Sequence, residues 1–220
     1  MVRGVIFDID GTLIDSVDLH AITWRRALYR FGHRIPYEVV RSQIGKGGDQ
    51  LLASLIPSAA RRDGPRVEAY RARLFRRWGL PRVQPFPRVR DLFLHLRGRG
   101  QRIALASSAK REEVPRYEEI AGIGDLVDAR AAAGDAEATK PEPDLFAVAL
   151  ARLGLPAPEV VVVGDSPYDA EAAGKLGLRT VGVLCGGFAK EDLRAAGCLE
   201  LFRDPADLLD RCPASLLSRY

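Results

Sequence analysis

The sequence lacks a hydrophobic run long enough to span a membrane, although 47% of its 220 residues are apolar. Its amino terminus also lacks a basic flank followed by a sustained apolar stretch, because Arg3, Asp8 and Asp10 interrupt the first apolar segment. We therefore expect no signal peptide, no membrane partner and a cytoplasmic location.

Cysteine is also scarce. The three cysteines are Cys185, Cys198 and Cys212. Their number does not allow complete pairing, and their spacing is not that of metal ligands, which argues against both a disulfide framework and a cysteine-based metal site. A reducing compartment is the simplest setting for such a chain.

The net charge of +4 is unevenly distributed. Residues 16–82 contain fourteen Lys or Arg and five Asp or Glu, so this segment carries +9 and the rest of the chain carries −5. Seven arginines lie between Arg61 and Arg77, which is one indication of nucleic-acid binding. They alternate with apolar residues at helical spacing, however, which favours a solvent-exposed helix face. We expect no nucleic-acid partner, and an anionic small substrate is the better alternative.

Hydrophobic periodicity separates a helical segment from one in which strands and helices alternate. The predicted helices are 20–31, 37–44, 49–55, 65–78, 89–97, 112–120, 144–153 and 169–176. The predicted strands are 2–7, 102–106, 126–129, 160–163 and 180–184. Between residues 16 and 82 we find no convincing strand, and a proline-rich linker follows at Pro81, Pro85 and Pro87.

Alternating strands and helices are typical of a parallel sheet that is covered by helices on both faces. We therefore predict an α/β fold whose core is a Rossmann-like, doubly wound parallel sheet. Because the first strand belongs to that sheet, the helical segment is an insertion. The predicted core domain comprises residues 1–15 and 83–220, and the predicted helical domain comprises residues 16–82.

Two aspartates follow the first strand directly. Alternate side chains of an extended chain share a face, so Asp8 and Asp10 start on the same side, and Gly11 allows the chain to turn after them. Such a pair suits metal binding and proton transfer. Two isolated aspartates could also simply end a strand before a turn.

Polar residues follow two further strands, at the carboxyl ends where doubly wound sheets bind ligands. Ser107 and Ser108 offer hydroxyl and N–H groups to an anion, while Asp165 and Asp169 follow the strand at 160–163. Lys140 precedes two prolines in a loop. Each residue alone has a structural explanation, as a helix cap or a surface lysine, but together they indicate a site.

These residues carry a resemblance to a known family. The matching segments are Asp8-Ile9-Asp10-Gly11-Thr12, Ser107, Lys140 and Gly164-Asp165-Ser166-Pro167-Tyr168-Asp169. In order and spacing they resemble the four motifs of the haloacid dehalogenase-like superfamily, and as a set these motifs are highly specific. Residues 16–82 resemble that family's helical cap domain, so the match covers the whole chain. Within the superfamily, the sequence is most similar to the phosphoglycolate phosphatase and β-phosphoglucomutase group.

The resemblance implies a magnesium-dependent phosphatase that acts on a small phosphorylated metabolite. Asp8 would attack phosphorus to give an aspartyl phosphate. Asp10 would protonate the leaving oxygen and later accept a proton from water, and we expect neighbouring carboxylates to raise its pKa. Mg²⁺ would be held by Asp8, the backbone carbonyl of Asp10 and Asp165.

The remaining motif residues would bind and orient the phosphate. Lys140 and Ser107, with Ser108 beside it, would hold phosphate oxygens, and Lys140 would also reduce the repulsion between Asp8 and its anionic target. The resemblance gives Asp169 an indirect role, the orientation of a metal-bound water or of Lys140.

Two residues of the helical segment are candidates for contact with substrate. Lys46 is flanked by glycines that let the backbone approach the site, and its ammonium group would suit a carboxylate or a second phosphate. A solvent-exposed turn is the alternative interpretation. His20 is expected to form a hydrogen bond at the hinge rather than to take part in the chemistry.

Two other functions stay open. Asp10 argues against dehalogenases and phosphonate hydrolases, which lack an acid there, but a β-phosphoglucomutase-like sugar phosphomutase is the alternative because His20 and Trp24 resemble its cap entry. Gly164 and the segment 45–48 weigh against it, since the mutase has an acidic residue at the first position and an arginine in the second. A non-catalytic binding protein of the same fold is a remote alternative. We expect a monomer or a homodimer.

Overall fold

Six parallel strands form the central sheet of the computed structural model, which describes residues 1–218. Their order across the sheet is β5-β4-β1-β6-β7-β8. The strands are β1 (Gly4–Phe7), β4 (Arg102–Ala106), β5 (Ala129–Ala131), β6 (Val160–Gly164), β7 (Arg179–Val183) and β8 (Cys198–Phe202). The first strand is central, with Val5 opposite Ile103 on one side and Val161 on the other. The predicted doubly wound sheet is confirmed.

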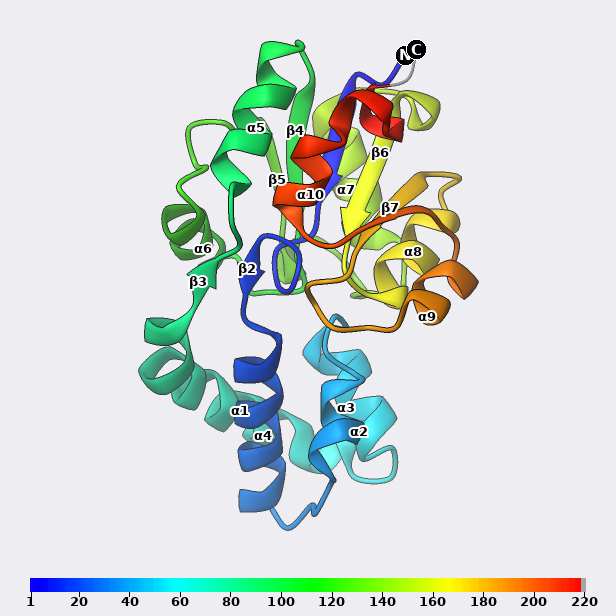
Figure 1. Cartoon of the computed structure of the whole chain (residues 1–220). Helices are drawn as coiled ribbons and strands as arrows, with labels where there is room; N and C mark the ends of the chain where they lie inside the picture. Colours follow the sequence, from blue (N-terminus) through cyan, green and yellow to red (C-terminus); the bar gives the residue numbers. More distant parts are fainter. Residues whose placement is uncertain (219–220) are drawn as a thin grey trace.

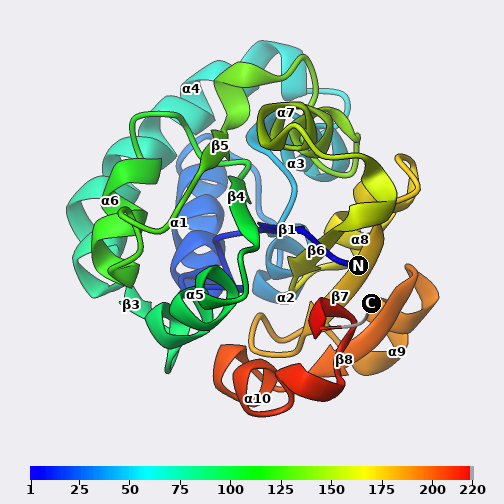
Figure 2. The same ribbon diagram turned by 90° about the horizontal axis from the view of Figure 1, so that it is seen from above.

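Helices cover both faces of this sheet (Figures 1 and 2). One face carries α5 (Val89–Gly98), α6 (Val114–Ala121) and α10 (Pro205–Asp210). The other carries α7 (Asp144–Leu153), α8 (Pro167–Gly174) and α9 (Lys190–Ala195). Strand side chains alternate between these layers, since Val5 and Phe7 belong to one hydrophobic cluster and Ile6 to another. Burial on both faces explains the continuous apolar runs of the strands.

Four helices form a second packed unit below the carboxyl edge of the sheet in Figure 1. They are α1 (Val17–Arg30), α2 (Tyr37–Arg41), α3 (Gly48–Leu55) and α4 (Ala60–Leu74). Their own hydrophobic cluster includes Trp24, Leu28, Leu51 and Val67. The two chain segments that lead to this unit pair as a short antiparallel ribbon, β2 (Ile14–Asp15) with β3 (Gln84–Pro85).

Several boundaries differ from the prediction. The strand predicted at 126–129 lies at Ala129–Ala131. Pro65 indicated a helix start, but α4 begins at Ala60, runs through this proline and continues as a π-helical turn at Phe75–Gly79. Strand β8 was not predicted, because its sequence includes Glu200 and has no clear alternation. Within residues 1–218, no helix has both the length and the apolar character needed to cross a membrane.

Candidate active site

The predicted site residues meet where the central strands end. Strand β1 leads into Asp8, β4 into Ser107 and β6 into Asp165, and these strands are direct neighbours in the sheet. The backbone N–H of Asp8 donates to the carbonyl of Val163, 2.9 Å away, which extends the sheet pairing to the first site residue. Parallel strands with a common direction therefore bring distant parts of the sequence to one edge.

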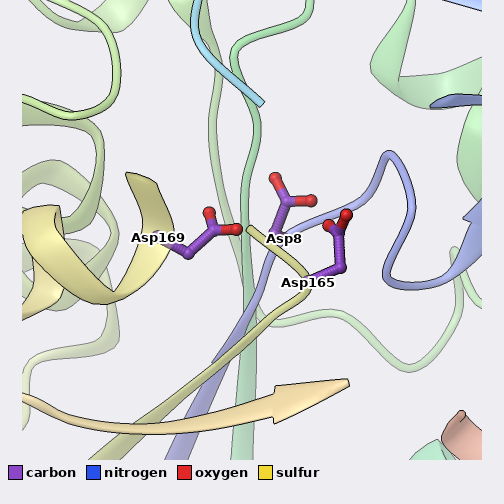
Figure 3. A group of neighbouring side chains, drawn as sticks. All are labelled: Asp8, Asp165 and Asp169. Atoms are coloured by element: carbon purple, nitrogen blue, oxygen red, sulfur yellow. The ribbon is translucent and has the colours of Figure 1, made fainter. Parts of the chain in front are cut away.

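Three buried carboxylates converge at this edge, as Figure 3 shows. Asp8, Asp165 and Asp169 each offer an oxygen atom, and these atoms all lie within 4.8 Å of one another. Burial raises the pKa of Asp8 to about 7, against the lowering effect of Lys140. Burial and the charges of Asp8 and Asp169 also raise the pKa of Asp165 well above its usual value. Repulsion between three carboxylates this close together lowers the stability of the fold unless a cation lies among them.

Lys140 supplies one positive charge to this cluster. Its side chain is 0% exposed, and its ammonium group contacts Asp8, lies 2.8 Å from an oxygen of Asp169 and donates to the carbonyl of Ala106 at 2.8 Å. Although burial lowers the pKa of Lys140, the two carboxylates raise it more, so the side chain stays protonated. The loop lysine of the sequence is thus fully buried beside the predicted nucleophile.

Glycines form a close cradle for Asp165. A Cβ atom added to Gly186 would lie 1.7 Å from Oδ2 of Asp165, and one added to Gly11 would lie 2.4 Å from the same oxygen. Gly11 also has a φ of +85°, which disfavours other residues. The hydroxyl of Thr12 donates to the other oxygen of Asp165 at 2.9 Å. This cradle and its hard oxygen donors fit a divalent cation such as Mg²⁺.

Asp10 lies outside the carboxylate cluster. Its Oδ1 accepts hydrogen bonds from the hydroxyl of Ser16 at 2.6 Å and from Nε2 of His20 at 2.8 Å. Burial tends to raise the pKa of Asp10, but His20, Ser16 and Arg71 together lower it below its usual value. The expectation that neighbouring carboxylates raise this pKa is therefore wrong, because the side chain turns toward donors and cations instead.

Arg71 stands behind this pair. Its guanidinium contacts Nδ1 of His20, and since arginine has no acceptor, that nitrogen must accept and the His20 proton lies on Nε2. The guanidinium also lies 5.2 Å from the ring centre of Trp24 and 5.0 Å from that of Phe75. The predicted exposed helix face does not extend to Arg71. The sequence indicates this inward position only by the spacing of Arg71, which lies four residues from both Val67 and Phe75, and these two are buried.

The serines after β4 have different surroundings. Ser107 is buried, and its hydroxyl oxygen accepts from the N–H of Ala109 at 3.0 Å, which leaves the hydroxyl hydrogen free to donate to a phosphate oxygen. Ser108 lies at the cavity wall, and its hydroxyl donates to the carbonyl of Gly45 at 3.5 Å.

The loop before α3 lies directly against the core. A Cβ atom on Gly47 would lie 2.1 Å from the hydroxyl oxygen of Thr139, and one on Gly45 would lie 2.8 Å from that of Ser166. The expected close backbone approach is therefore present. The ammonium of Lys46 donates to Gln43 at 2.7 Å and to Ser54 at 2.9 Å, so its strongest contacts are within the helical unit.

A cavity of about 280 Å³ lies between the sheet edge and the helical unit. Its wall includes Asp8, Asp10, His20, Lys46, Arg71, Ser108 and Glu113. Arg71 and Glu113 were not among the predicted site residues. Glu113 had no signal in the sequence and Arg71 had only its spacing, because arginine and glutamate at a helix start or face are ordinarily solvent-exposed.

Comparisons with known proteins agree with this geometry. A family model described as haloacid dehalogenase-like hydrolase matches residues 2–177. A protein named "Probable phosphatase IndB" from Dickeya dadantii (strain 3937) is 31% identical over 201 residues, which cover 87% of this chain and 85% of the relative. The phosphoglycolate phosphatase of Yersinia pseudotuberculosis serotype I (strain IP32953) is 32% identical over 84% of this chain and 82% of its own. A solved hydrolase structure from Pseudomonas syringae has a TM-score of 0.90 at 27% identity and covers 96% of this chain and 98% of that one.

Proposed function

Because the chain belongs to the haloacid dehalogenase-like hydrolase family, we propose that it is a Mg²⁺-dependent phosphatase of small phosphorylated metabolites, similar to phosphoglycolate phosphatase. One observation carries the proposal. A carboxylate, Asp8, lies at the cavity wall beside the buried ammonium of Lys140 and within 4.8 Å of Asp165 and Asp169. This arrangement supplies a nucleophile, a fixed cation and ligands for a metal at one point.

In the proposed reaction, an oxygen of Asp8 attacks phosphorus and forms an aspartyl phosphate while the bond to the leaving oxygen breaks. Asp10 gives its proton to that oxygen. Water then attacks phosphorus, Asp10 takes a proton back, and phosphate leaves with Asp8 restored. The lowered pKa of Asp10 suits the second step, and approach of a phosphate dianion raises its proton affinity for the first.

Asp8, Asp165 and the backbone carbonyl of Asp10 would hold Mg²⁺, which when bound offsets negative charge on the phosphate oxygens. Asp169 is already engaged: it accepts from the N–H of Ser166 at 3.1 Å and from its hydroxyl at 2.7 Å, and it pairs with Lys140. We therefore assign Asp169 the orientation of Lys140. Lys140, Ser107 and Ser108 would bind the phosphate.

Residues 16–82 would act as a cap over the phosphate site. The contacts of Gly45 and Gly47 with the core support a cap that is closed in this structure. His20 would hold Asp10 from the cap side, and Lys46 would complete the cavity wall.

The space around Gly164 helps to decide between the phosphatase and the mutase alternative. A Cβ atom on Gly164 would lie 2.6 Å from Cβ and Cγ of Asp169. The acidic side chain that the family resemblance implies for the mutase at this position therefore has no space here while Asp169 keeps its position. This favours hydrolysis over a mutase-like metal site.

Phosphate release from a panel of phosphomonoesters tests the proposal, with Mg²⁺, with a chelator and in an Asp8→Asn variant. We expect release that stops in the chelator and in the variant. Asp15→Asn is the matched control, because this exposed aspartate lies in the ribbon outside the cavity. Absence of release from every ester would contradict the proposal. Conversion of β-glucose 1-phosphate to its 6-phosphate isomer without release would establish the mutase instead.

A further inference from the structure

Glu113 is a buried acid with no visible structural task. It directly precedes α6, and its residue is only 8% exposed. The carboxylate does not cap the helix, and its Oε1 is buried without a hydrogen-bond partner among the described residues. A buried carboxylate oxygen without a partner is costly, so its position at a cavity wall points to a ligand group.

A matching unpaired donor lies on the opposite unit. Nε of Arg71 is also buried without a partner in the described chain, and Arg71 lines the same cavity from α4. Both side chains line the same cavity as Asp10, and the guanidinium of Arg71 contacts His20, which donates to Asp10. Asp10 would face the leaving oxygen, so Glu113 and Arg71 belong to the alcohol side of the cavity.

Apart from the solvent-exposed Glu137, the other charged groups at this wall have partners. Lys46 donates to Gln43 and Ser54, and Lys110 lies 3.7 Å from Glu68. Asp49 accepts from the hydroxyl of Thr139. Among the buried atoms of the described lining residues on this side, Oε1 of Glu113 is left as an unpaired acceptor and Nε of Arg71 as an unpaired donor. The buried hydroxyl of Tyr117, which is not a lining residue, also has no partner.

A hydroxyl group is chemically complementary to both atoms, because it donates one hydrogen bond and accepts others. A carboxylate can only accept, and it would be repelled by the buried charge of Glu113. An ammonium group can only donate. Resting on the proposed phosphatase activity, we propose that Glu113 is a specificity-determining residue that accepts a hydrogen bond from a hydroxyl on the alcohol part of the ester. The substrate class is then the monophosphates of polyhydroxy alcohols, including sugars.

Two esters with the same two-carbon frame test this inference. In 2-hydroxyethyl phosphate, a CH₂OH group replaces the carboxylate of 2-phosphoglycolate. We expect kcat/KM of the wild-type protein to favour 2-hydroxyethyl phosphate by about tenfold or more, since a buried hydrogen-bonding site discriminates strongly against a mismatched group. The Glu113→Gln substitution removes the charge at nearly constant size, and it should reduce this ratio at least severalfold.

Glu112→Gln is the control, because Glu112 is the exposed neighbour of Glu113 and should leave the ratio unchanged. A wild-type preference for 2-phosphoglycolate would overturn the inference, as would an unchanged ratio in folded Glu113→Gln protein. If this variant does not fold, the wild-type ratio alone decides. A preference for 2-aminoethyl phosphate over 2-hydroxyethyl phosphate would also overturn it, in favour of a cationic partner.

Hydrolysis of 4-nitrophenyl phosphate, which lacks any such group, tests the phosphatase activity separately. If this compound and both esters are inert, the inference fails together with the proposed function.

Discussion

The aspartates Asp8 and Asp10 of the site differ in pKa because their surroundings differ. Asp8 lies among carboxylates, and burial raises its pKa to about 7 despite Lys140. Asp10 lies two residues later but faces Ser16 and His20, with Arg71 behind, and its pKa is lowered. Two residues of one short turn can thus have pKa values that are shifted in opposite directions. Such a difference suits the proposed roles of a nucleophile and a proton-transfer group.

Replacement of Arg71 by Met should weaken catalysis mainly at acidic pH. Loss of this cation raises the pKa of Asp10, so less of the ionised form is present to accept a proton from water. We expect kcat for 4-nitrophenyl phosphate, whose good leaving group needs no proton from Asp10, to fall severalfold on the acidic side of its pH profile and to change less on the alkaline side.

The matched control is Arg73→Met, since Arg73 lies on the same helix but is exposed. A uniform loss across the pH range in Arg71→Met would show that Arg71 acts through packing on Trp24 and Phe75 rather than through Asp10.

Among the elements, the loop before α3 makes the tightest contact between the two units. Gly45 has a φ of +108°, and both it and Gly47 lie where a side chain would meet core atoms. Asp49, in the first turn of α3, accepts from Thr139 on the core side. The glycines therefore set how closely the helical unit can approach the sheet edge, and with it the shape of the cavity.

A Gly47→Ala substitution should push these units apart. Its Cβ would lie 2.1 Å from the Thr139 hydroxyl oxygen and 2.4 Å from Cβ of that residue, so one side must move. We expect kcat/KM to fall by roughly ten- to a hundredfold, because small displacements of catalytic groups are costly. Steady-state kinetics on any accepted ester measures this.

Gly48→Ala is the control, since the nearest atoms to its added Cβ lie at 3.4 Å, an ordinary contact. Both variants should keep the circular dichroism spectrum of the wild type. Equal activity of Gly47→Ala and wild type would mean that the closed contact is not needed for turnover.

At the scale of the whole molecule, the parallel sheet concentrates negative charge at one edge. Three acids from β1, β6 and the start of α8 meet there, and Lys140 is the cation that contacts two of them. The fold tolerates this crowding because the sheet is held by apolar clusters on both faces. Stability should then depend on pH and on a bound cation.

Without metal, the protein should lose stability as pH rises. The pKa of Asp8 rises from 3.8 to about 7 on folding, and that of Asp165 also rises. The stability that these protonated groups contribute is present below their unfolded pKa and is lost as pH rises through the folded values. In chelator we expect a lower Tm at about pH 8 than at about pH 5, and Mg²⁺ should raise Tm more at the higher pH.

Thermal unfolding of wild type and Asp165→Asn checks this prediction. The variant removes one crowded carboxylate, so its Tm in chelator should be higher at alkaline pH and its response to Mg²⁺ smaller. An equal Mg²⁺ response at both pH values would contradict the argument.

The sequence by itself determined the sheet and the motif residues at its edge. Period-two and period-3.6 patterns are local, so α7 and β4 were predicted at their observed bounds, and the rule that parallel strands bind ligands at their carboxyl ends brought Asp8, Ser107 and Asp165 together. The less regular β8 was missed, because its pattern depends on packing against β7 rather than on its own residues.

Only the tertiary structure decided the surroundings of each side chain. The direction of the Asp10 side chain, the buried Nε of Arg71 and the unpaired Oε1 of Glu113 depend on contacts between the helical unit and the sheet edge. Such contacts join residues far apart in the chain, and their electrostatic effects depend on distance and burial, which no local sequence pattern records. Local pattern therefore determined which residues are proposed to bind phosphate, whereas tertiary packing decided which side chains face the rest of the cavity.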